Sequence, residues 1–145
     1  MKLREGVLEE ASSVGVCHVW PETIDSINIL NASILAMHKA IAKLSMVPEY
    51  ILVDGNRFKP YGKIPYKTMI KGDGRFLSIA AASILAKTER DLLMEKLHTD
   101  HPHYDWINNK GYPTRKHREA LKVYGSTKYH RQSFKLLPLQ LKLEL

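Results

Sequence analysis

Two acidic residues stand where a folded chain can do metal chemistry. Asp54 follows the apolar run at residues 50–53, which predicts a buried strand that delivers this carboxylate at its carboxyl end. Asp73 lies just ahead of a long helical pattern that begins near Phe76. Ligands of open α/β sheets bind at the carboxyl edge of the strands, and carboxylate oxygens suit hard divalent cations. The pattern therefore allows a metal site that Asp54 and Asp73 share.

The same two residues have a plainer interpretation. Aspartate is common in turns that follow strands, so Asp54 can be a turn residue. Aspartate is also a favoured helix cap, so Asp73 can cap the helix that follows it. The spacing alone leaves both interpretations open.

The elements before Asp54 follow from hydrophobic spacing. Residues 2–11 are predicted to be the end of an amphipathic helix, and residues 14–19 a short strand that Pro21 ends. Thr23 or Asp25 caps the next helix. That helix packs on the sheet through one apolar stripe, made of Ile27, Leu30, Ile34, Met37, Ile41 and Leu44.

The elements around Asp73 and beyond it are a loop and two helices. Residues 57–69 are rich in Pro, Gly, Lys and Tyr, which predicts a loop that can touch a nucleic-acid backbone. A long helix is predicted over residues 76–97. Thr114 is predicted to cap a short helix from about residue 116 to residue 124.

Length and composition favour one compact α/β domain over residues 1–145. With 44% hydrophobic residues and no repeat or linker, a single core is expected, and the lone Cys17 excludes an internal disulfide framework. No signal peptide or membrane-spanning run is recognised. We therefore expect no membrane partner and a cytoplasmic location.

The positive charge is concentrated after residue 50. The net charge is +7, yet residues 1–50 hold 4 Lys or Arg and 6 Asp or Glu, whereas residues 51–145 hold 18 and 9. Basic residues around two acids suggest a polyanion drawn to a metal site, because Lys and Arg neutralise phosphates. A solvated basic surface that aids solubility explains the same charge.

The last third of the chain carries further candidates. Gly111 and Pro113 are predicted to hold Tyr112 in a fixed turn. The tyrosine ring is then either packed with its hydroxyl bonded to backbone, or exposed as a plate against a sugar or base. Donors suited to phosphate oxygens follow at His130, Arg131 and Ser133.

Three histidines, His98, His101 and His103, are close enough in sequence to bind zinc. Pro102 breaks the helix between them and no cysteine is near, so the usual spacing of zinc ligands is absent. We expect these histidines to cap helix ends and to face solvent. A small zinc-binding interaction protein is kept as an alternative.

Taken together, these residues resemble bacterial ribonuclease HII over nearly the whole chain and in family order. Any one matching stretch is weak, but chance explains the whole set poorly. The matching stretches are Ile24-Asp25 with Asn28-Ile29, Ile51-Leu52-Val53-Asp54-Gly55-Asn56-Arg57, Lys71-Gly72-Asp73, residues 78–87 with Arg90-Asp91, Lys110-Gly111-Tyr112-Pro113-Thr114, His117, and His130-Arg131 with Ser133-Phe134.

The resemblance implies an RNase H-like α/β fold, a mixed sheet flanked by helices, with four carboxylates that hold two Mg²⁺ or Mn²⁺ ions. Asp54 matches the family's third acid, Asp73 its fourth, and Tyr112 the tyrosine that packs on the sugar at the DNA–RNA junction. The implied activity is hydrolysis of the RNA strand of RNA–DNA hybrids and cleavage at ribonucleotides embedded in duplex DNA. The products carry a 5′-phosphate and a 3′-hydroxyl.

The resemblance also suggests the contacts with nucleic acid. The implied substrate is an RNA–DNA hybrid or a DNA duplex with an embedded ribonucleotide, in DNA replication and repair, and no obligate protein partner is expected. Besides Tyr112, the predicted phosphate or sugar contacts are Lys110, Gly111, Asn56, Arg57, Lys71, Lys87, His130 and Arg131.

One departure from the family pattern is important. The family's first two acids form an Asp-Glu pair in an Asp-Glu-Ala-Gly-Arg-Gly-like motif on the first strand, and this sequence has no such motif. Glu9-Glu10 lies in a helical context without glycines and is not a substitute. We therefore expect the family fold without its first strands, and a chain that alone is inactive or nearly so. A catalytically inactive nucleic-acid-binding fragment of the same fold is the alternative.

Overall fold

The computed structural model describes residues 1–132, which divide into two compact units. The first unit comprises residues 1–18 and 30–89, and the second comprises residues 19–29 and, of the described chain, residues 90–132. The long helix α4 (Leu77–Asp100) contributes to both units. Each unit buries apolar side chains of its own.

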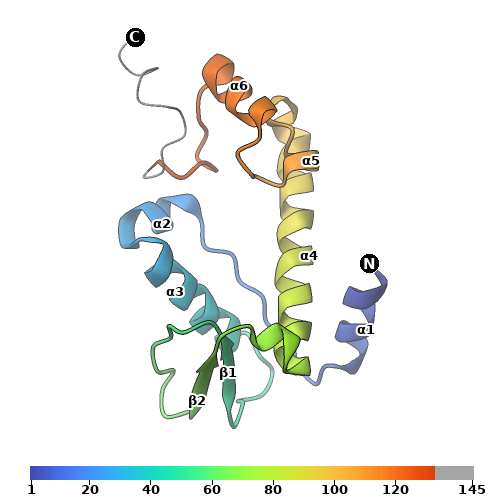
Figure 1. The fold of residues 1–145 in the computed structure, drawn as a ribbon, viewed down its shortest axis with the longest axis vertical. Helices are drawn as coiled ribbons and strands as arrows, with labels where there is room; N and C mark the ends of the chain where they lie inside the picture. The colour runs from blue at the N-terminus through green and yellow to red at the C-terminus, as the bar shows by residue number, and fades with distance from the viewer. Residues whose placement is uncertain (133–145) are drawn as a thin grey trace. The chain divides into compact units, whose positions relative to one another are not determined.

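The first unit holds the sheet. Strand β1 (Ile51–Asp54) pairs in parallel with β2 (Tyr66–Met69), and Asp54 stands opposite Met69 in the register. Figure 1 shows the two strands side by side, and the 3-10 turn η1 (Gly72–Gly74) follows β2. Because the strands are parallel, their carboxyl ends meet at one edge of the sheet.

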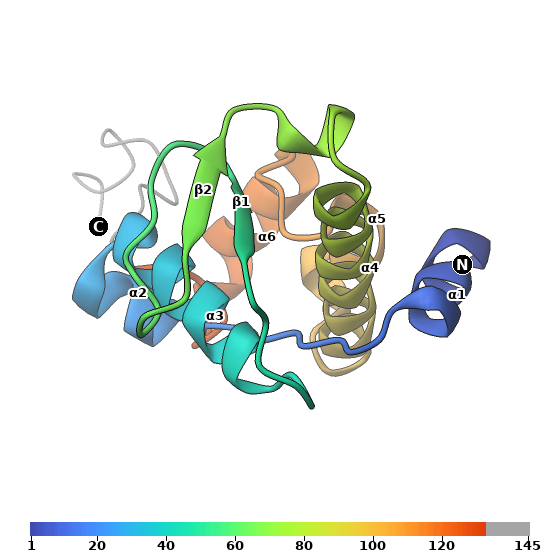
Figure 2. The ribbon, with the colours of Figure 1, turned by 90° about the horizontal axis from the view of Figure 1, so that it is seen from below.

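The helices of the first unit are α1 (Lys2–Glu10), α3 (Ile29–Ala42) and the first turns of α4. Figure 2 shows α3 running beside the two strands. An apolar cavity of about 640 Å³ is lined by residues of α3, β1 and α4. The buried hydrophobic side chains of this unit are Ala32, Ile34, Val53, Met69, Ile79 and Leu85.

The second unit is built from α2 (Pro21–Ile27), the last turns of α4, α5 (Trp106–Asn109) and α6 (Arg115–Tyr124). Figure 1 shows α5 and α6 together beside the end of α4. Tyr104 and Trp106 are each 1% exposed, and their rings stack with centroids 5.0 Å apart. Large buried aromatic rings dominate the energy of a small core. The rest of this core is made of Leu97, Ala120 and Leu121.

The structure contradicts the predicted strand at residues 14–19, because no strand forms there. Gly15 lies so close to α3 that a Cβ atom at this position would be 2.1 Å from the carbonyl oxygen of Ala40. The Nζ atom of Lys43 donates a hydrogen bond to the Val16 carbonyl oxygen over 2.7 Å. The segment therefore packs on α3 at Gly15, and the Lys43 side chain bonds a carbonyl oxygen that a neighbouring strand would otherwise bond.

The predicted helix that follows is also corrected. Pro21 begins α2, where its fixed φ and missing N–H suit a first helical turn. Asn28 has a φ of 69° and divides the predicted single helix into α2 and α3. Thr23 and Asp25 therefore lie inside α2 and do not cap it.

Other elements agree with the prediction or add to it. The strand that ends in Asp54 is present, and α1 and α4 occupy the predicted helical regions. Thr114 caps α6, since its Oγ1 accepts the N–H of His117 over 3.3 Å. Strand β2 lies within the region predicted as loop. Among the described residues, no helix is both long enough and apolar enough to cross a membrane.

Candidate active site

The two predicted metal ligands come together at the carboxyl edge of β1. Asp54 is the last residue of the strand, and its Oδ1 accepts a hydrogen bond from the backbone N–H of Gly72 over 3.0 Å. Asp73 directly follows Gly72 in the chain, and its Oδ1 accepts the N–H of Gly74 over 3.0 Å. The turn η1 thus brings the second acid beside the first.

The residue type at Gly72 follows from the crowding around it. Gly72 is buried, and a Cβ atom there would lie 2.6 Å from Ile79 Cδ1 and 2.9 Å from Met69 Cγ. The preceding Lys71 adopts a left-handed conformation, with a φ of 54°. The backbone from Lys71 to Asp73 sets the position of Asp73. Its middle residue, Gly72, has no room for a side chain.

The two acids suit a hard divalent cation in their chemistry. Both side chains are exposed, and each carboxylate has more acceptor capacity than its one backbone hydrogen bond uses. Across residues 1–132, no group of three or more His, Cys, Asp and Glu side chains is placed to hold a metal ion. Two carboxylates are fewer than the roughly six oxygen ligands that Mg²⁺ prefers.

Four predicted contacts with nucleic acid are exposed in the first unit. Asn56 and Arg57 follow β1 directly, Lys71 precedes η1, and Lys87 lies on α4. Exposure is required of side chains that bind phosphate. These residues are therefore available for the role that the sequence predicts.

Aromatic side chains anchor the loop that follows Arg57. The ring of His38 on α3 contacts those of Phe58 and Tyr61 edge-on, with centroids 5.3 and 5.2 Å away. The His38 Nε2 atom lies 2.9 Å from the Lys59 carbonyl oxygen. Phe58 also contacts Tyr66 of β2. The loop is thus fixed to the helix and to the sheet of the same unit.

In the second unit, Tyr112 is 61% exposed at the end of a tight turn. Lys110 and Gly111 have positive φ values of 50° and 89°. The side chain of Asn109 accepts the Gly111 N–H and its carbonyl oxygen accepts the Tyr112 N–H, both over 2.9 Å. The backbone is fixed while the ring is exposed, which favours the plate over the packed turn aromatic.

Arg90 of α4 makes a contact that the sequence did not predict. Its Cζ atom lies 4.9 Å from the centroid of the Tyr112 ring, and its Nη2 donates to the Lys110 carbonyl oxygen over 2.8 Å. A guanidinium over an aromatic face is attractive and restricts the ring. The only signal in the sequence is that Arg90 follows Lys87 by one helical turn, which says nothing of Tyr112.

His130 is buried together with His117. The two side chains are 6% and 5% exposed, and their Nε2 atoms lie 3.1 Å apart. Burial, together with the neighbouring His117 and His101, lowers the pKa of His130 to about 4. The His130 Nδ1 atom lies 2.9 Å from the backbone N of Thr127. This burial argues against the direct phosphate contact that the sequence predicts for His130.

The remaining predicted donors lie at the end of the described chain. Arg131 is half-buried. The N–H of the next residue, Gln132, donates to Asp25 Oδ2 over 2.8 Å, which ties this segment to α2 of the same unit. Ser133 and Phe134 lie outside the described residues.

The arrangement of the three histidines gives the zinc-binding alternative no support. His98, His101 and His103 belong to no group of metal-binding side chains in the described part of the chain. The ring of His103 packs on Tyr124 with centroids 4.0 Å apart, and that of His101 lies 5.7 Å from Trp106. His101 and His103 are therefore part of the aromatic packing of the second unit, and the expectation that they face solvent is wrong for these two.

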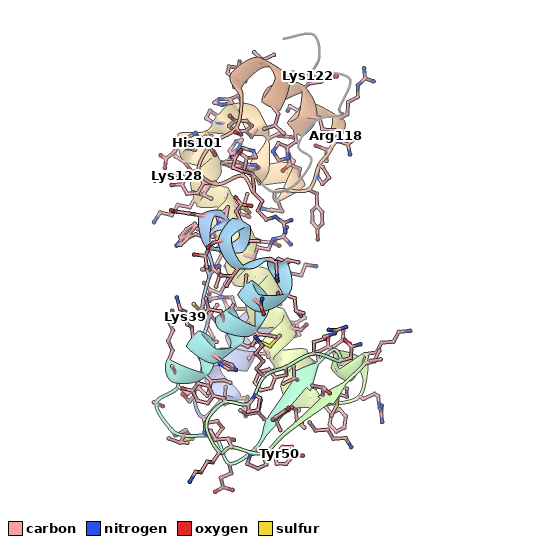
Figure 3. The ribbon with its side chains drawn as sticks, turned by 90° about the vertical axis from the view of Figure 1, so that its left-hand side faces the viewer. Lys39, Tyr50, His101, Arg118, Lys122 and Lys128 are labelled. Atoms are coloured by element: carbon pink, nitrogen blue, oxygen red, sulfur yellow. The ribbon has the colours of Figure 1, made fainter. Side chains whose placement is uncertain are left out.

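Exposed basic side chains lie along α6 and just after it in the second unit. Figure 3 labels Arg118 and Lys122 on this helix and Lys128 after it, and all three side chains are exposed. Arg115 and Lys116 on the same helix pair with Glu119 and Asp105, over 2.9 and 3.3 Å. A helix of this charge is suited to a phosphate backbone.

Comparison with known proteins gives one family. The family model described as Ribonuclease HII matches residues 7–137. The chain is 62% identical over 142 residues to the ribonuclease HII of Christiangramia forsetii, which covers 98% of this chain and 72% of the relative. It is 57% identical over 143 residues to the ribonuclease HII of Phocaeicola vulgatus, which covers 99% of this chain and 71% of the relative.

A solved structure shares the fold. The crystal structure of ribonuclease H2 from Pyrococcus horikoshii OT3 matches with a TM-score of 0.76 at 23% identity, over 93% of this chain and 71% of that chain. The RNase H-like α/β fold that the sequence resemblance implies is therefore confirmed, and the described residues contribute two parallel strands to it.

Proposed function

The chain belongs to the ribonuclease HII family of RNase H-type endoribonucleases, and we propose that it cuts the RNA strand of RNA–DNA hybrids and the site of a ribonucleotide embedded in duplex DNA. One structural observation supports this proposal above the others. The hydrogen bond from the Gly72 N–H to Asp54 brings Asp54 and Asp73 to the same edge of the sheet. Two carboxylates at that edge are suited to metal-dependent cleavage of a phosphodiester.

We assign Asp54 and Asp73 as ligands of the divalent metal on which the family depends, with Mg²⁺ or Mn²⁺ as the ion. When bound, such an ion activates a water and stabilises the leaving oxygen of an in-line displacement. The chain's own part is to hold two hard oxygen donors at the end of a strand. The N–H groups of Gly72 and Gly74 orient these carboxylates.

The substrate contacts are proposed from exposure and charge. Tyr112 presents its ring to the ribose, where the 2′-hydroxyl is the group that distinguishes RNA from DNA. Basic side chains and backbone N–H groups hold the phosphates, and in doing so fix the register of the duplex. Besides Tyr112, the proposed contacts are Asn56, Arg57 and Lys71 with Lys87 in the first unit, and Lys110, Gly111 and Arg131 in the second unit.

The proposed reaction breaks the bond between phosphorus and the 3′-oxygen of the ribonucleotide strand. The oxygen of a water molecule forms the new bond to phosphorus, and the 3′-oxygen leaves and takes up a proton. The products are a 5′-phosphate and a 3′-hydroxyl. Since the substrate is found where DNA is copied and repaired, we propose a cytoplasmic setting in a bacterial cell.

A cleavage assay tests this function. The substrates are a duplex with one embedded ribonucleotide and the matching all-DNA duplex, each with Mg²⁺, Mn²⁺ or a chelator. The 145-residue chain and any longer product of its reading frame are assayed in parallel. We expect metal-dependent cleavage at the ribonucleotide and none of the all-DNA duplex. Weak cleavage is expected of the 145-residue chain, since its described residues place two carboxylates at the edge.

The alternative of an inactive binding fragment is less favoured, because the relatives that share most of this sequence are named as ribonucleases. Binding of a hybrid without metal-dependent cleavage, by the chain and by any longer product, would support that alternative. Cleavage of both duplexes at the same rate would contradict the proposed recognition of the ribonucleotide.

A further inference from the structure

Two buried imidazoles connect the Tyr112 turn to the loop before Arg131. The Nδ1 atom of His117 lies 3.0 Å from the Tyr112 carbonyl oxygen, and its Nε2 lies 3.1 Å from the Nε2 of His130. The Nδ1 of His130 lies 2.9 Å from the backbone N of Thr127. Three polar contacts in a row therefore join Tyr112 to Thr127.

The two ends of this row decide where the protons lie. The Thr127 N–H is a donor, so the Nδ1 of His130 must accept and carries no proton. The Tyr112 carbonyl oxygen is an acceptor, so the Nδ1 of His117 must donate. A neutral imidazole has one proton, which puts the proton between the rings on the Nε2 of His130. Each ring of the neutral pair thus donates toward Tyr112.

The surroundings of the pair favour this neutral arrangement. The ring of His130 packs against Tyr104 and Trp106, with centroids 4.9 and 5.4 Å away. A further proton on the His117 Nε2 would set two N–H groups against each other across 3.1 Å. Burial, with smaller contributions from His117 and His101, also lowers the pKa of His130 to about 4, so the ring is neutral at neutral pH.

His117 acts on the turn at one atom. The Tyr112 carbonyl oxygen accepts both the His117 Nδ1–H and the N–H of Thr114, the latter over 2.8 Å. Thr114 in turn accepts the backbone N–H of His117 through Oγ1. The ring and the backbone of His117 therefore hold the chain on both sides of Pro113, while Arg90 restricts the Tyr112 ring.

From these contacts we propose that His117 and His130 are positioning residues, a pair with one fixed tautomer that holds Tyr112 in place for the ribose. The pair itself follows from the hydrogen bonds of the second unit. The claim that the pair positions Tyr112 for the ribose rests on the proposed function. The buried His130 thus acts through His117 on the Tyr112 turn and does not contact a phosphate.

Nitrogen-15 NMR of the imidazoles in the full chain tests the pair directly. At about pH 7.5, well above the ordinary pKa of histidine, we expect a proton on Nδ1 of His117 and on Nε2 of His130. The opposite tautomers, or a mixture in exchange, would overturn the proposal. This measurement needs no variant and no activity.

A matched pair of variants tests the effect on the turn. His117→Gln keeps a donor and an acceptor near the Tyr112 carbonyl, whereas His117→Leu keeps neither. We expect the Thr114 N–H to exchange with solvent about tenfold faster in His117→Leu than in the wild type, with His117→Gln in between. Equal exchange in all three proteins would show that His117 does not hold the turn.

Binding links the pair to the substrate. We expect His117→Leu to weaken binding of the ribonucleotide duplex about fivefold, and to add no further loss to Tyr112→Leu in the double variant, because residues that act as a unit are not additive. Binding of the all-DNA duplex should stay unchanged. Equal weakening on both duplexes would mean a merely structural role and would overturn the positioning.

The failure of the proposed function would look different. If Tyr112→Leu alone leaves binding of the ribonucleotide duplex unchanged, the ribose contact of Tyr112 is wrong, and so is the positioning of Tyr112 for it. The tautomers and the exchange of the Thr114 N–H would still decide whether the pair holds the turn.

Discussion

Asp54 and Gly72 are joined by a 3.0 Å hydrogen bond between a strand-end carboxylate and a backbone N–H, and this bond fixes where Asp73 stands. Gly72 has no space for a side chain, because Ile79 and Met69 fill its surroundings. The position of both acids therefore depends on a residue that carries no chemistry of its own.

The first prediction concerns this glycine. A Cβ atom at Gly72 would lie 2.6 Å from Ile79 Cδ1, so Gly72→Ala must shift either the turn or the core. We expect the free energy of unfolding to fall by about 1–3 kcal/mol, the usual cost of overpacking. Mn²⁺ should also bind about tenfold more weakly, since ligand orientation is lost. Urea denaturation and calorimetric titration measure the two effects.

Gly74 provides the control for this variant. A Cβ atom at Gly74 meets nothing within 4 Å, so Gly74→Ala should leave both quantities close to those of the wild type. A loss of Mn²⁺ binding in Gly74→Ala as large as that in Gly72→Ala would contradict the role given to Gly72.

The second prediction concerns the two carboxylates. Asp54→Asn and Asp73→Asn keep the size of each side chain and remove its charge, and should each lower cleavage by at least about a hundredfold, as expected for one electrostatic group of an active site. Glu9→Gln removes an exposed charge from α1 and is the control. Single-turnover cleavage of the ribonucleotide duplex is the measurement. Equal rates for Asp73→Asn and Glu9→Gln would exclude Asp73 as a metal ligand.

The third prediction concerns pH. The pKa of His130 falls from 6.5 to about 4 on folding, chiefly through burial and also through His117 and His101. Between these values the unfolded chain binds the proton and the folded chain does not, so stability is greatest above pH 6.5 and is lost as the pH falls toward 4. The slope from this one group is at most about 1.4 kcal/mol per pH unit.

Urea denaturation at several pH values measures this slope. His130→Gln should remove it, whereas His18→Gln, at an exposed position, should leave it in place. An unchanged slope in His130→Gln would show that the buried imidazole does not carry the pH dependence. Tyr104 packs on the same ring, and burial raises its pKa, so it stays neutral throughout this range.

Local patterns in the sequence predict part of this structure. The apolar run before Asp54 forms β1, and Thr114 caps α6, because each of these features depends on residues close together in the chain. The sequence also predicts the position of Asp73 near a helix start. Its closeness to Asp54 follows from the Gly72 hydrogen bond, which no spacing reveals.

The features that the sequence did not predict depend on tertiary contacts. Strand β2 exists through its pairing with β1, and residues 14–19 form no strand since Gly15 packs on the backbone of α3. Because His130 stands between Lys128 and Arg131 in the sequence, it is expected to be an exposed donor. In the structure the rings of Tyr104 and Trp106 pack against it. Burial of a polar residue cannot be read from its own position in the sequence.

The last prediction tests whether residues 1–145 fold as one domain, as the sequence favours. Gly15 belongs to the first unit and both tryptophans, Trp20 and Trp106, belong to the second. Gly15→Ala would place a Cβ atom 2.1 Å from the Ala40 carbonyl oxygen, so we expect a loss of about 3 kcal/mol or more, at the upper end of overpacking. In one cooperative domain, this loss lowers the urea midpoint that tryptophan fluorescence reports.

Gly6→Ala, in helix α1 with nothing within 4 Å, should instead stabilise by about 0.5–1 kcal/mol. A tryptophan midpoint that neither variant moves would mean that the two units unfold independently.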